Sequence, residues 1–153
     1  MTHSRRFFVL PLMMLGACPE ECDNPPSAPI VCTAVRAVIN GNVYDGCQDN
    51  AFNTGGSLNV ASSSGTGANY MELNFGADAA VGTTTIGSGV STTFQVDTPV
   101  GIWVAGPSAG SGSLTIATLT ATGATGTFFF TAPPAGGATG NTVATGGTFN
   151  VTF

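Results

Sequence analysis

Few residues of this 153-residue chain can act as acids, bases or activated nucleophiles. His3 is the only histidine, lysine is absent, and the basic residues are Arg5, Arg6 and Arg36. The Gly-Pro-Ser-Ala-Gly segment around Ser108 matches the nucleophile elbow of esterases, but an elbow needs a histidine base and a following helix. With a net charge of −5, the chain also lacks the cations that neutralise phosphates. We therefore expect neither an enzyme nor a nucleic-acid-binding protein.

The carboxylates are the remaining candidates for chemistry. Asp45 and Asp49, with Asn50 beside them, offer oxygen ligands for a weak calcium site. A polar hairpin exit is the simpler interpretation. A hydrolase that uses two carboxylates would need two of them within about 10 Å. The other acidic residues of the body are isolated in sequence: Glu72, Asp78 and Asp97. We expect no metal centre and no cofactor.

The N-terminus has the organisation of an export signal. Residues 1–6 are basic and residues 7–17 are apolar or small, a length that suits a signal peptide. Leu15-Gly16-Ala17-Cys18 resembles the lipobox of bacterial lipoproteins, in which the cysteine becomes the first mature residue and carries acyl chains. Removal of residues 1–17 leaves one arginine against eight acids, a net charge of −7. A soluble secreted protein with Cys18 in a disulfide is the alternative.

Two details concern the export route and destination. The paired Arg5-Arg6 resembles a twin-arginine signal, but we favour the basic end of a general signal. Pro19 stands where lipoproteins of the inner membrane often carry aspartate. The expected location is therefore the bacterial cell envelope, anchored by lipid in the outer membrane.

Residues 18–32 form a tether after the lipidated cysteine. The segment 19–31 contains four prolines and three acids, and proline neither donates a backbone hydrogen bond nor fits within a sheet. Cysteines in an exported chain favour disulfides. We expect Cys32 to pair with Cys47, and Cys22–Cys47 is the alternative.

The Asn40-Gly41 pair predicts a tight hairpin, because both residues tolerate the positive φ of a type I′ turn. This register places Arg36 opposite Asp45, which predicts a structural ion pair. It also places Cys47 opposite Ala34, diagonal to Cys32.

The body, residues 33–153, is predicted to be one all-β domain. Short apolar–polar alternations recur between clusters rich in Gly, Ser and Pro, which is typical of antiparallel sheets with one buried face. The alternating apolar positions include Met71, Leu73 and Phe75, and later Leu114 and Ile116. We expect a single antiparallel β-barrel or β-sandwich of about eight to ten strands.

Aromatic residues provide the candidate ligand contacts. If the barrel is hollow, its pocket would be lined by Tyr44, Phe75, Phe94, Phe128 and Phe130. Trp103 and Phe129 interrupt the alternation. Exposed aromatics on a β-surface stack on sugars or anchor partners, although we favour burial of both.

Four short motifs follow one another along the body of the chain. They are residues 37–41 with Tyr44, then 82–84, then 126–132, then 147–151. In this order they resemble an uncharacterised group of bacterial lipoprotein domains common in Bacteroidetes-type genomes. Tyr44 stands where tryptophan is commoner, and Thr84 where an aromatic is usual. The resemblance implies a calycin-like or barrel-like β-fold at the cell envelope and no established activity.

Two functions follow as expectations. The first is a non-enzymatic, lipid-anchored envelope protein whose β-domain binds or scaffolds an envelope partner. The second is a lipocalin-like carrier of a small apolar ligand, which requires a cavity of at least ~300 Å³.

Overall fold

The computed structural model describes residues 33–65, 69–87 and 91–153. The predicted signal peptide (1–17), Cys18 and the tether (18–32) lie outside these residues. A 3-10 turn, η1 (Gly76–Asp78), accompanies eleven strands: β1 (Val35–Ile39), β2 (Asn42–Thr54), β3 (Ser57–Ser64), β4 (Tyr70–Phe75), β5 (Gly82–Ile86), β6 (Thr92–Thr98), β7 (Gly101–Ala105), β8 (Ser111–Leu119), β9 (Gly123–Ala132), β10 (Pro134–Gly136) and β11 (Thr142–Thr152). Within the described ranges, no helix is long and apolar enough to span a membrane.

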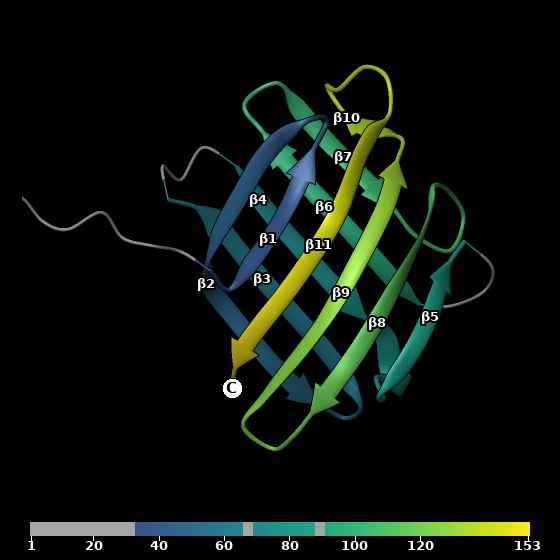
Figure 1. Ribbon diagram of the computed structural model, residues 1–153. Helices are drawn as coiled ribbons and strands as arrows, with labels where there is room; N and C mark the ends of the chain where they lie inside the picture. The colour runs from purple at the N-terminus through teal and green to yellow at the C-terminus, as the bar shows by residue number, and fades with distance from the viewer. Residues whose placement is uncertain (1–32, 66–68, 88–90) are drawn as a thin grey trace, which may run out of the picture.

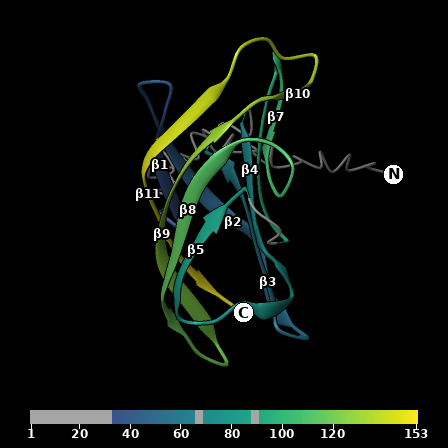
Figure 2. The same ribbon diagram turned by 90° about the vertical axis from the view of Figure 1, so that its right-hand side faces the viewer.

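The strands form one antiparallel sheet in the order β10-β7-β6-β4-β3-β2-β1-β11-β9-β8-β5. The sheet curls into a half-barrel with two facing walls (Figure 1). The front wall contains β1, β11, β9, β8 and β5, and the back wall contains β3, β4, β6, β7 and β10. Figure 2 shows the two walls edge-on. The predicted all-β, antiparallel, barrel-like fold is therefore confirmed.

The hairpin at Asn40-Gly41 has the predicted register. Both turn residues have positive φ, 48° and 84°, and β1 pairs with β2 through Ile39–Asn42, Val38–Val43, Ala37–Tyr44 and Arg36–Asp45. Asn40 also ties the turn to β11, because its Oδ1 accepts from the Val143 amide at 2.9 Å.

The sheet turns from one wall to the other within β2. Residues 42–46 of β2 pair with β1, and residues 46–54 pair with β3. Gly46 stands at the change, where a Cβ atom would lie 2.8 Å from Cε1 of Tyr44 and 2.9 Å from Oγ of Ser62. The corner therefore requires glycine.

Aromatic rings join the two walls across the core. Phe94 of β6 stacks on Phe130 of β9, with ring centroids 4.8 Å apart and planes 10° apart. Phe128 joins them at 5.9 Å from Phe94. Phe75 of β4 meets Phe149 of β11 edge-on at 5.4 Å. Offset and edge-on contacts of this kind are the favourable geometries for aromatic pairs.

The strand β11 lies between β1 and β9. Its pairing with β9 shifts register between Ala144 and Gly147, which marks a β-bulge. Gly146 of this bulge has φ 59° and open space where a Cβ would point. The bulge thus leaves bare backbone on the outer surface of the front wall.

The eleventh strand, β10, is beyond the eight to ten expected. The Pro133-Pro134 segment predicts a turn, but Pro134 pairs with Trp103 at the edge of the sheet. Proline is tolerated there because an edge strand leaves one row of amides unpaired.

Candidate functional site

A row of hydroxyl side chains runs across the outer surface of the front wall, one from each of four neighbouring strands. Thr83, Thr115, Thr127 and Thr148 follow one another across β5, β8, β9 and β11. The hydroxyls of Thr83 and Thr115 are 2.8 Å apart and hydrogen-bonded. The next residue in this cross-strand row, on β1, is Arg36. The wall therefore presents an ordered polar surface that carries little charge.

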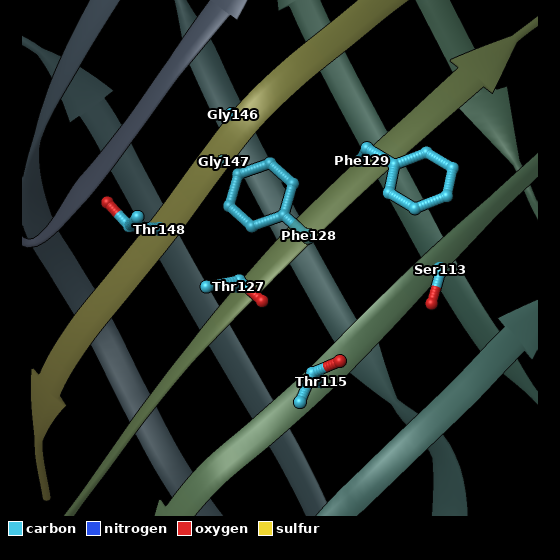
Figure 3. Close-up of a pocket in the computed structure, with 8 residues that line it drawn as sticks. All are labelled: Ser113, Thr115, Thr127, Phe128, Phe129, Gly146, Gly147 and Thr148. Carbon is cyan, nitrogen blue, oxygen red and sulfur yellow. The ribbon is translucent and has the colours of Figure 1, made fainter.

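A hollow of about 320 Å³ lies on this surface around Phe129 (Figure 3). The Phe129 side chain is 56% exposed, although burial is the expectation from sequence. Five side chains that line the hollow point outward from three strands. They are Ser113 and Thr115 from β8, Thr127 and Phe129 from β9, and Thr148 from β11. Ser113 sits directly opposite Phe129 in the pairing of β8 with β9.

The glycine pair of the β11 bulge shapes the hollow. Gly146 and Gly147 both line it. A Cβ on Gly147 would lie 2.5 Å from the ring of Phe128 beneath, so the backbone packs directly on the core there. Gly146, by contrast, has open space where a Cβ would point, so the absence of a side chain there keeps the space beside Phe129 open.

A second hollow, of about 280 Å³, adjoins the first. It is lined by Gly146 and Thr148 on β11, which the two hollows share, and by Arg36, Val38 and Val43 on β1 and β2. Arg36 Nε donates to Asp45 Oδ1 at 2.5 Å, and both side chains are about half exposed. The single charge of this hollow is thus compensated at its rim.

A third space, larger than these two hollows, is a cleft of about 420 Å³ at one end of the half-barrel, which we call the end cleft. It lies between the β1–β2 turn and the β6–β7 turn. Its apolar lining includes Tyr44, Val96 and Trp103, and Val43 and Val100 stand at its mouth, 70% and 74% exposed. Polar groups come from Asn40, Asn42, Asn69, Thr98 and Thr142.

Tyr44 and Trp103 are both held by hydrogen bonds at the end cleft. The Tyr44 hydroxyl donates to the Ser62 carbonyl at 2.8 Å, and Trp103 Nε1 donates to the Gly140 carbonyl at 2.9 Å. Burial raises the pKa of Tyr44 to about 12. Its hydroxyl is therefore a neutral hydrogen-bond donor at ordinary pH and not a base.

The five aromatic ligand candidates lie in different surroundings. Phe94, Phe128 and Phe130 form the central stack, and Phe75 packs on Phe149. Of the five, Tyr44 alone lines the end cleft, and Phe128 alone lines the hollow around Phe129. The interior between the walls is filled where the phenylalanines meet.

Three further carboxylates lie away from the hollow around Phe129. Glu72 accepts hydrogen bonds from Asn59 Nδ2 at 2.6 Å and from the Tyr70 hydroxyl at 3.2 Å, and Asp97 accepts from Gln95. Burial, with Glu72 nearby, raises the pKa of Tyr70 to about 12. Asp49 accepts from the Ser63 hydroxyl. These carboxylates are satisfied by neutral donors.

The other sequence candidates carry no assembled chemistry. The segment around Ser108 is a tight turn bridged from Gly106 to Ala109, and it leads into strand β8, not into a helix. Among the described residues, no three potential ligands from His, Cys, Asp and Glu gather to hold a metal ion. Cys47 lies on β2 opposite Ser63. Its predicted partner Cys32 and the alternative Cys22 lie outside the described residues, so the pairing stays a prediction.

No family model, curated protein or solved structure matches this chain. The likeness to the lipoprotein domain group therefore stays a prediction. Sequence reasoning missed Ser113, Thr115, Thr127 and Thr148 as site residues. Their alternation with buried residues marks them as outward-facing. The pairing of β8 with β9 brings Ser113, Thr115 and Thr127 together, and the place of β11 beside β9 adds Thr148.

Proposed function

We propose that this protein is a lipid-anchored component of the bacterial cell envelope, of the outer membrane in particular, whose β-domain acts by binding. The observation that carries the binding role is the hollow around Phe129. It combines an exposed aromatic ring with hydroxyl side chains on a rigid sheet. None of the side chains that line this hollow titrates near neutral pH, so it is suited to holding a ligand and not to acid–base chemistry.

The anchoring part of the proposal rests on Leu15-Gly16-Ala17-Cys18 and on the proline-rich tether. With at least two acyl chains on Cys18, membrane attachment would be stable, whereas one chain binds only marginally. The tether would hold the β-domain away from the lipid surface.

Replacement of Cys18 by serine is expected to abolish lipidation. In cells fed radioactive palmitate, the wild-type protein should incorporate the label and sediment with the outer membrane. The C18S variant should do neither. An inhibitor of lipoprotein signal peptidase should make the uncleaved precursor accumulate. Cys47→Ser is the control, because it removes a cysteine without touching the lipobox. Unlabelled wild-type protein, or labelled C18S, would contradict the anchor.

The end cleft favours a second candidate function, a carrier of a small apolar ligand. Its volume of about 420 Å³ falls within the range of small-molecule sites, which occur at the mouths of β-barrels. Tyr44 and Trp103 supply apolar surface, while the asparagines at the rim could orient a polar head group.

Titration with oleate tests the carrier function directly. Trp103 is the only tryptophan, so its fluorescence reports on the end cleft, and a saturable change is expected. Val100→Glu at the mouth should weaken binding strongly, because Val100 lines the end cleft and neither hollow of the front wall. Val81→Glu is the matched control, because Val81 is similarly exposed and does not line the cleft. An unchanged spectrum, or equal losses in both variants, would exclude the carrier.

A further inference from the structure

The two hollows of the front wall adjoin each other along β11, and together we call them the outer groove. They share Gly146 and Thr148 of β11. From this strip the groove extends past Phe129 to β8 on one side and past Val38 to β2 on the other. Crossing β8, β9, β11, β1 and β2 takes four inter-strand spacings of ~4.8 Å, or about 19 Å. The shape therefore suits a chain-like ligand better than a compact one.

The side chains of the outer groove match the chemistry of sugars. The exposed ring of Phe129 offers an apolar face, and a sugar ring presents C–H groups that pack on such a face. Ser113, Thr127 and Thr148 add hydroxyls to the lining of the same hollow. Each hydroxyl both donates and accepts hydrogen bonds, as the hydroxyls of a sugar do.

The distribution of charge selects a neutral ligand. The hollow at Phe129 has no charged lining residue, and Arg36 in the adjoining hollow is paired with Asp45. The carboxylates Glu72 and Asp97 lie on the back wall, and the whole chain is acidic. An anionic polymer would find no uncompensated cation in the groove and would be repelled by the rest of the surface.

We propose that the outer groove binds an extended, neutral polysaccharide, with one sugar ring stacked on Phe129. This proposal rests on the binding role proposed above and specifies its ligand class. The glycine bulge of β11 is part of the site, because a side chain at position 146 would fill the space that the sugar occupies.

Affinity electrophoresis in native gels tests the proposal. The full-length lipoprotein, kept in a polyoxyethylene detergent that contains no sugar, is run through gels that hold laminarin, hydroxyethylcellulose, mannan or dextran. Polygalacturonate serves as the charged comparator. We expect retardation by at least one neutral polysaccharide and none by polygalacturonate.

Variants locate the interaction. Phe129→Ala should lower the affinity by about tenfold or more, and Phe129→Tyr should retain it, because tyrosine keeps the ring. Phe52→Ala is the matched control, because Phe52 is also an exposed phenylalanine (42%) but lies on β2 outside the groove. Thermal unfolding followed by circular dichroism checks that each variant is folded.

Three results would overturn the proposal: no retardation by any neutral polysaccharide, equal retardation by polygalacturonate, or equal losses in Phe129→Ala and Phe52→Ala. None of these results bears on the proposed lipidation of Cys18. If the wild-type protein is labelled with palmitate but binds no polysaccharide, only the proposed ligand class is rejected. If the wild-type protein is not labelled, the proposed envelope function is rejected.

Discussion

Replacement of Phe130 by alanine should lower the free energy of unfolding by about 3–5 kcal/mol. Phe130 is only 1% exposed, and its ring stacks on Phe94 from the opposite wall at 4.8 Å and lies 6.1 Å from Phe128. The substitution removes the apolar surface and leaves a cavity between the walls. Domains are stable by only about 5–15 kcal/mol, so this loss is a large share of the total. Urea denaturation should show a lower midpoint with an unchanged slope.

The neighbouring residue provides the control for this prediction. Phe129→Ala removes the same side chain one position along β9, where it is more than half exposed. Its effect on stability should stay within about 0.5 kcal/mol, as for most surface substitutions. Equal losses in the two variants would show that the stack does not hold the walls together.

A methyl group at Gly126 should destabilise the protein by about 3 kcal/mol or more, the upper range for overpacking. A Cβ at this position would lie 2.1 Å from the Thr115 carbonyl oxygen and 2.4 Å from Cζ of Phe149. The carbonyl belongs to the backbone of the paired strand β8 and cannot move without breaking the pairing. Gly126→Ala should therefore displace β8 from β9, and thermal unfolding measures the loss.

Gly136→Ala is the matched substitution on the edge strand β10. Its Cβ would meet Ile102 Cδ1 at 3.6 Å, an ordinary van der Waals contact, and Gly136 has no positive φ. Alanine there should be neutral or stabilise by about 0.4–1 kcal/mol, because it restricts the unfolded chain. A Gly126→Ala variant as stable as Gly136→Ala would contradict the close approach of β8 and β9.

Local sequence signals predicted the parts of the fold that depend on neighbouring residues. Asn40-Gly41 determines a turn with a single strand register, and this register brings Arg36 opposite Asp45. Alternation predicted which side chains of β4 and β8 face the core, Met71 and Leu114 among them. These features depend only on the period of a strand and on turn chemistry.

Features that depend on pairing between strands far apart in the chain could not be predicted from the sequence. Nothing local in residues 142–152 indicates that β11 pairs with both β1 and β9. The exposure of Phe129 also depends on the tertiary structure, which leaves the outer surface of β9 uncovered. Phe128 and Phe130 both face inward, so Phe129 must face outward, and no second layer within the described residues covers that surface. The sequence expectation of burial assumed an interior on both sides of the strand. Trp103, by contrast, is buried as expected.

The position of β11 constrains when the protein can fold. The ribosome makes β1 first and β11 last among the described strands, yet β1 joins β9 in the front wall only through β11. Partial chains can form hairpins such as β1–β2 and β8–β9 but cannot complete the wall. Pairing between such distant segments is intrinsically slow. Completion of the front wall therefore has to follow the synthesis of residues 142–152, which supply the strand between β1 and β9. An incomplete wall of this kind is compatible with the proposed export, in which the chain would cross a membrane before it folds.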